Sequence, residues 1–181
     1  MAGFREVLEF WFGDHARPRW FVKEPAFDEL IRTRFETTHR AALAGQLDGW
    51  QDGSDGALAL VIALDQLPRN MYRGSARAFA ADEKAREVAR LATQRGFDLM
   101  QPVNRRNFFY LPFEHSEDLA DQDFYLALVR ERIGEARTVE WGMKHRVIIA
   151  RFGRFPHRNQ ALGRVTTPDE AAFLKGPNSS F

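Results

Sequence analysis

The chain has 181 residues and none of them is cysteine. This absence excludes disulfide bonds, thiolate catalysis, iron–sulfur clusters and zinc sites that are built on cysteine. A chain without disulfides is typical of the reducing interior of the cell, and we therefore expect a cytoplasmic protein.

Long apolar stretches are also absent. The longest run covers only residues 57–64, whereas a membrane-spanning helix needs about 20 residues. The first residues carry charges at Arg5, Glu6 and Glu9 and lack the apolar core of a signal peptide. The sequence therefore predicts no association with a membrane.

A strong net charge is missing as well. The 26 Lys and Arg residues almost balance the 25 Asp and Glu residues, so no global field attracts nucleic acid and any anion site must be local. Only Tyr72 and Phe155 stand among basic residues as a base-stacking platform would require, and we expect no nucleic-acid partner. Phosphate-binding glycine loops, dinucleotide fingerprints, serine elbows and metalloprotease motifs do not occur, and we expect no cofactor.

Aromatic residues are plentiful, with 16 phenylalanines and 4 tryptophans. Each ring buries much apolar area, which predicts a core filled by rings. The sets expected there are residues 10–12, 20–21 and 108–110.

The spacing of apolar residues is helical throughout, and no segment shows the alternation of a strand. About eight helices with short links predict an all-α helical array or irregular bundle, as a single domain over residues 1–181. We expect Asp82 and Ser116 to cap helices, and Thr167 to open a capping box with Pro168 at the first helical position. The predicted helical ranges are 4–12, 25–45, 55–67, 81–95, 106–113, 116–133 and 135–155, with a short last helix from Pro168.

Two similar polar turns follow strongly apolar helical stretches. The first turn (residues 65–74) contains Pro68-Arg69-Asn70, and the second turn (residues 152–164) contains Pro156-His157-Arg158-Asn159. Guanidinium groups offer forked donors that suit carboxylate or phosphate, and asparagine both donates and accepts. These turns are the first candidates for a functional surface.

Three long motifs resemble the DUF924 family. They are residues 64–70, 110–118 and 145–159, and the opening segment 7–13 and closing segment 179–181 are similar too. Leu67 departs from the phenylalanine expected there, which changes packing rather than chemistry. The resemblance implies an all-α fold like that of tetratricopeptide-repeat (TPR) proteins and implies no activity.

In the first turn, Asp65 and Gln66 end a buried helix, where unpaired carbonyls favour cations. Arg69 and Arg73 therefore either bind an external anion or clamp helices together through buried carboxylates.

The second turn and the residue before it gather basic residues that repel one another: Arg151, Arg154, His157, Arg158 and Arg164. Their compensation comes either from the acidic groups of residues 114–121 or from a bound phosphate or carboxylate.

The segment 114–122 is acidic and contains His115. If it is one helix, Glu114, Asp118 and Asp121 share a face, and His115 and Asp118 form a candidate pair of base and orienting carboxylate. The alternative is an acidic first helical turn, whose carboxylates interact favourably with the positive end of the helix dipole. No second histidine stands at zinc-like spacing, and we expect no metal site.

In the helix that follows, His145 falls among Trp141, Ile149 and Phe152, which predicts a core histidine with one hydrogen bond. Arg146 lies on the side of Gly142 and Gly153, where the missing side chains leave room for a neighbouring helix or a ligand.

These observations favour a TPR-like binding protein that recognises an anionic small molecule or peptide end, or a protein partner. The alternatives are a hydrolase or transferase acting on a phosphorylated or carboxylated small molecule, with His115 and Asp118 or with His157 at its centre, and a purely structural adaptor. The C-terminal tail with its carboxylate at Phe181 suggests a peptide end as one such ligand, and the tail itself is a second candidate occupant of the protein's own groove. The expected ligand-binding residues are Asp65, Arg69, Asn70, Arg73, Glu114, Arg154, Arg158 and Asn159.

Overall fold

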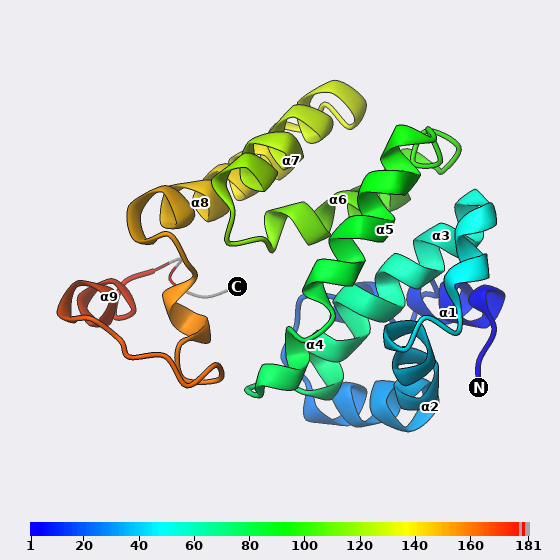
Figure 1. Ribbon diagram of the computed structural model, residues 1–181, viewed down its shortest axis with the longest axis horizontal. Helices are drawn as coiled ribbons and strands as arrows, with labels where there is room; N and C mark the ends of the chain where they lie inside the picture. The colour runs from blue at the N-terminus through cyan, green and yellow to red at the C-terminus, as the bar shows by residue number, and fades with distance from the viewer. Residues whose placement is uncertain (178, 180–181) are drawn as a thin grey trace. The chain divides into compact units, whose positions relative to one another are not determined.

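A computed structural model of the chain describes residues 1–177 and 179 (Figure 1). These residues form helices and turns and include no strand, which confirms the all-α prediction. The chain divides into two compact units: unit 1 comprises Met1–Arg73 and Arg77–Pro112, and unit 2 comprises Gly74–Ala76 and Phe113–Phe181. The single domain and the TPR-like arrangement stay predictions, and the carboxylate of Phe181 lies outside the described residues.

A buried helix forms the centre of unit 1. Residues 57–64 are 0–1% exposed, and α3 packs against α1 and α5 while α4 packs against α2. This confirms the prediction of a central helix that is apolar on every side. The elements of this unit are α1 (Phe4–Trp11), η1 (Arg17–Arg19), α2 (Pro25–Leu43), η2 (Asp48–Asp52), α3 (Ser54–Val61), η3 (Ile62–Gln66), α4 (Leu67–Met71), η4 (Ala76–Ala78, which begins in unit 2), α5 (Asp82–Gln94) and most of α6 (Val103–Glu114).

The central helix is longer than predicted and contains an irregular segment. We expected one helix over residues 55–67; instead α3 passes through a π-helical segment, η3, into α4 and ends at Met71. In this segment the carbonyl oxygen of Ala63 lies 2.9 Å from Nδ1 of His39 on α2. The first turn is therefore largely helical, and its motif Pro68-Arg69-Asn70 lies within α4.

Rings fill the core of unit 1. Trp11 is fully buried, and the ring of Trp20 lies 4.7 Å from that of Phe108 and donates its indole N–H to the carbonyl of Trp11. The prediction that Phe21 belongs to this core is wrong, because its side chain is 76% exposed. Its neighbour Trp20 points into the core instead.

Helix ends follow local chemistry in most places. Pro25 stands at the first position of α2, and Gly45, with φ of +79°, follows its end as predicted. α5 departs from the prediction: Asp82 is its first helical residue and does not cap it, because Ala81 holds the N-cap position. α6 begins at Val103, earlier than expected, and keeps Pro112 inside the helix.

Unit 2 is built on two helices that lie side by side, α7 (Leu119–Arg132) and α8 (Ala136–Phe152) (Figure 1). Gly142 allows their close approach, since a Cβ atom there would stand 2.3 Å from Cε1 of Tyr125 on α7. This confirms the neighbouring helix as the occupant of the space at Gly142. The unit continues with η5 (Pro156–Arg158) and α9 (Pro168–Phe173).

Three helix ends in unit 2 bear on the candidate site. Asp118, not Ser116, caps α7: its Oδ1 accepts a hydrogen bond from the N–H of Ala120 at 2.8 Å. α8 ends at Phe152 rather than at residue 155, because Gly153 adopts φ of +66° and stops the helix. The capping box of Thr167 is confirmed at the start of α9.

Across the described residues, each helix falls short of the length and apolar character that crossing a bilayer requires.

Candidate functional site

Arg69 of the first turn binds two carboxylates of unit 1. Its Nη1 lies 3.1 Å from Oδ1 of Asp65, and its two terminal nitrogens donate to Asp82 at 3.0 and 3.1 Å. Asp65 is completely buried. Such a geometry is what a clamp between α4 and α5 requires, because a buried carboxylate needs a charged partner.

Arg73 and Asn70 share the carboxylate of Asp28 on α2. Arg73 donates to both oxygens of Asp28 at 2.8 Å, and Asn70 donates its amide to Oδ1 at 2.7 Å. The four candidate residues of the first turn thus lie within ion pairs and hydrogen bonds of unit 1. Their role toward an external anion stays a prediction.

In the second turn, Arg154 and Asn159 bind Glu170 at the start of α9. Arg154 donates to Glu170 at 2.6 and 2.9 Å, and the amide of Asn159 donates to it at 3.2 Å. The hydrogen bond from Arg154, followed by the backbone N–H of Thr167, lowers the pKa of Glu170 to about 2. These contacts close the second turn onto α9.

Glu117 holds the backbone of Phe155 in place. It accepts hydrogen bonds from Arg164 at 2.7 and 2.9 Å and from the N–H of Phe155 at 2.8 Å. Burial disfavours the ionised carboxyl, but Arg164 and the Phe155 N–H outweigh it and keep the pKa of Glu117 below its ordinary value. Glu117 is one of the acidic groups that the sequence offered as compensation, and it pairs with Arg164. The partner of Arg154, Glu170, lies outside that predicted set.

Three basic side chains surround the buried ring of Phe155. The guanidinium carbon of Arg158 lies 4.6 Å from the ring centroid. The imidazole centroids of His145 and His157 lie 5.8 and 5.6 Å from it. We call these three basic residues and Phe155 the Phe155 cluster. It joins α8 to η5 and consists mainly of basic groups.

The electrostatics of the Phe155 cluster keep its histidines neutral. Burial lowers the pKa of His145 to about 3, and the charges of His115 and Arg158 add to this effect. Burial, followed by the charge of Arg158, lowers the pKa of His157 to about 4. Both imidazoles are therefore uncharged at neutral pH, and Arg158 supplies the positive charge.

Glu114 stands beside the Phe155 cluster at the end of α6. Its side chain is buried, and Oε1 lies 3.6 Å from Nδ1 of His145. The same Nδ1 lies 3.1 Å from the carbonyl oxygen of Trp141, which assigns its proton to this contact because a carbonyl oxygen only accepts. His145 is buried as predicted for a core histidine, and it is also the functional candidate that the sequence analysis missed. No local signal joins it to Glu114, which stands far away in the sequence.

The remaining candidates of segment 114–122, His115 and Asp118, have different surroundings. His115 is half-buried and acts on His145 and His157 through its charge. Asp118 is exposed and caps α7, which matches the interpretation as an acidic first helical turn. In the described part of the chain, no three histidine, aspartate or glutamate side chains gather as a metal site would need.

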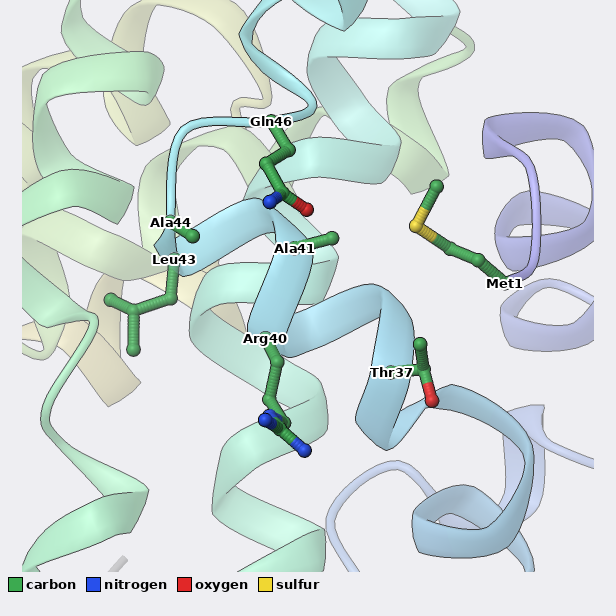
Figure 2. Close-up of a pocket in the computed structure, with 7 residues that line it drawn as sticks. All are labelled: Met1, Thr37, Arg40, Ala41, Leu43, Ala44 and Gln46. Atoms are coloured by element: carbon green, nitrogen blue, oxygen red, sulfur yellow. The ribbon is translucent and has the colours of Figure 1, made fainter.

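Hollows of the surface occur in unit 1. The larger one, of about 550 Å³, is lined by side chains around the second half of α2 (Figure 2). Figure 2 shows the side chain of Arg40 extending away from Gln46. None of the candidate residues predicted from the sequence lines it. Its lining residues are Met1, Thr37, Arg40, Ala41, Leu43, Ala44 and Gln46.

The comparisons with known proteins agree with the sequence motifs. The model of a family described as "Bacterial protein of unknown function (DUF924)" matches residues 7–178. A solved structure of a protein of unknown function from Agrobacterium tumefaciens is similar to this chain: the identity is 41%, the match covers 96% of this chain and 97% of the other, and the TM-score is 0.90. A comparison with curated proteins gives no match. The chain therefore belongs to the DUF924 family.

Proposed function

We propose that the protein binds a small anionic ligand or a peptide end, and that the Phe155 cluster in unit 2 receives its carboxylate or phosphate group. The observation that carries this proposal is the convergence of Arg158, His145 and His157 on one buried ring. Burial is the main cause of the lowered pKa values of His145 and His157, and the positive charge of Arg158 lowers them further. An anion would pair with the positive charge of Arg158 and accept hydrogen bonds from guanidinium and imidazole N–H groups.

The half-buried position of His157 supports access from solvent. Arg158 stands next to it in the chain and supplies a forked donor that suits carboxylate or phosphate. Arg154 and Asn159 border the same turn through Glu170 and would fix the shape of the site rather than hold the ligand directly. Within the sites predicted from the sequence, Arg158 is thus the residue on which this proposal depends most.

The test is a titration of the protein with inorganic phosphate, acetate and a short peptide, followed by NMR of the imidazole signals. A bound anion favours imidazolium, so the pKa of His157 should rise from about 4 when a ligand saturates the site. Arg158→Ala should abolish the shift. Arg151→Ala is the matched control, because Arg151 also lies 4.6 Å over a phenylalanine ring, that of Phe152, but is exposed.

A pKa of His157 that is unchanged by every anion would contradict the proposal, as would equal shifts in wild type and Arg158→Ala. An amidated peptide distinguishes the two ligand classes: if a peptide end is bound through its carboxylate, amidation removes the shift.

An enzyme is the second candidate, because a neutral imidazole beside a guanidinium can accept a proton while the guanidinium stabilises developing negative charge. A pKa of about 4 makes His157 a weak base at neutral pH, and for this reason binding comes first. Hydrolysis of a phosphate monoester such as p-nitrophenyl phosphate tests the idea. Turnover that disappears in His157→Gln or His115→Gln, with phosphate binding retained, would establish catalysis.

A further inference from the structure

A second hollow of unit 1 has a lining of unusual composition. Its volume is about 290 Å³, and it lies where α1 meets the start of α3 and the beginning of α6. Two arginines, two carboxylate residues and two apolar residues form its walls: Arg5, Arg105, Glu9, Asp55, Leu8 and Phe12.

The apolar part of the hollow comes from α1. Leu8 and Phe12 stand one helical turn apart and are 7% and 5% exposed, so they present a firm surface at the base of the hollow. Arg5 and Glu9 also stand one helical turn apart on this helix, and both are exposed. The hollow therefore combines an apolar base with charged walls.

The four charged groups do not neutralise one another. Within residues 1–177 and 179, Arg5, Glu9 and Arg105 form no ion pair, and Asp55 accepts a hydrogen bond from the neutral amide of Gln101 at 2.6 Å. The two guanidinium groups lie over rings instead: Arg105 is 4.4 Å from the centroid of Phe12. Arg5 is 5.7 Å from the centroid of Phe4. Charges of both signs thus face one space with their hydrogen-bonding capacity available.

We propose that this hollow binds the zwitterion of a free α-amino acid with an apolar side chain. The guanidinium groups of Arg5 and Arg105 take the carboxylate, and the carboxylates of Glu9 and Asp55 take the ammonium group. Leu8 and Phe12 contact the apolar side chain. The volume of about 290 Å³ is at the lower end of ligand pockets, which begin near 300 Å³, and this favours a single amino acid over a longer peptide.

This site is separate from the Phe155 cluster, which belongs to unit 2, and the proposal does not depend on the proposed function. The test uses the full chain, labelled with ¹⁵N, and L-leucine as the probe at millimolar concentration. Saturable shifts of the amide signals of residues 5–12 and 103–106 are expected. N-acetyl-L-leucine, which lacks the ammonium group, and L-leucinamide, which lacks the carboxylate, should each bind at least about tenfold more weakly.

Glu9→Gln and Arg105→Gln are the variants, and each should weaken L-leucine binding by about tenfold or more. Glu83→Gln is the matched control, because Glu83 is an exposed carboxylate on α5 that does not line the hollow, and it should bind as the wild type does. Absence of saturable shifts with L-leucine would overturn the proposal. Equal binding of N-acetyl-L-leucine and L-leucine would overturn it too, because the hollow would then recognise only an anion.

Discussion

The first turn in unit 1 and the second turn in unit 2 carry the same residue types, yet their cations are balanced in different ways. Arg69 and Arg73 bind the carboxylates of Asp65, Asp82 and Asp28. In the second turn, Arg154 and Arg164 are paired in a similar way with Glu170 and Glu117. Arg158 also acts on Glu117 through its charge, and its guanidinium lies over the ring of Phe155, which His145 and His157 contact as well. The comparison teaches that a short motif of proline, arginine and asparagine does not define a site; the side chains that meet it do.

The largest effect on stability is expected when the cation that pairs with the buried carboxylates of the first turn is removed. Arg69→Ala would leave the buried carboxylate of Asp65 and that of Asp82 without their shared cation. Loss of one member of a buried ion pair costs about 3–5 kcal/mol. Urea denaturation should show a decrease of this size in the free energy of unfolding. A decrease below about 1 kcal/mol, the range of surface pairs, would mean that Arg69 is not a clamp.

The next largest effect is expected on acidification, which should lower the free energy of unfolding through His145 in unit 2. The pKa of His145 is lowered to about 3, whereas the unfolded chain has an ordinary value of about 6.5. The unfolded state therefore binds more protons below pH 6.5, and stability is full above this pH and decreases as pH falls toward the folded value. At pH 5 the loss due to His145 should be about 2 kcal/mol.

The check is a series of denaturation curves between pH 7 and pH 5 for wild type and His145→Gln. The variant has no imidazole at this position, so its stability should decrease less on acidification, by the amount assigned to His145. His39 and His157 also have lowered pKa values and are present in both proteins, so they cancel in the difference. Identical pH dependence of the two proteins would contradict the assignment.

A smaller effect on stability, with a clear spectroscopic sign, is expected for Arg158→Ala. The contact of a guanidinium with a buried ring is worth about 0.5–2 kcal/mol. Arg158 also contributes to the lowered pKa of His157, so the variant should show a higher pKa of His157 in the absence of any ligand. NMR titration of the imidazole signals measures it, and an unchanged pKa would place Arg158 outside the electrostatics of the Phe155 cluster.

The smallest change is expected for Arg73→Ala. The side chain of Arg73 is 35% exposed, and Asp28 keeps the hydrogen bond from Asn70 when Arg73 is removed. A loss of about 0.2–1 kcal/mol in denaturation follows from the usual strength of accessible ion pairs. A loss as large as that of Arg69→Ala would show that both arginines of the first turn are equally essential to the fold.

Local features of the fold followed from the sequence. Pro25 and Gly45 mark the ends of α2, Thr167 forms the capping box of α9, and the apolar run 57–64 forms the buried centre of unit 1. Each of these depends on residues close in the chain, where backbone geometry and capping decide the outcome.

Features that depend on distant residues did not follow. Asp82 has the residue type of a cap, but its partner is Arg69, and the sequence gives no indication of that pairing. The approach of Glu114 to His145 likewise joins the end of α6 to α8. The prediction of Phe21 in the core failed as well: Trp20 packs against Trp11 and Phe108, whereas Phe21 is 76% exposed.

The π-helical segment Ile62–Gln66 determines in which direction around the helix axis the later side chains of the central helix point. A π turn holds one residue more than an α turn, and one residue corresponds to a rotation of about 100° around the helix axis. Deletion of a single residue there, such as Ala63, would restore an uninterrupted α-helix and turn Arg69, Asn70 and Arg73 to another side. The ion pairs of the first turn therefore depend on one extra residue in a segment that begins with three apolar residues and itself supplies Asp65, the buried partner of Arg69.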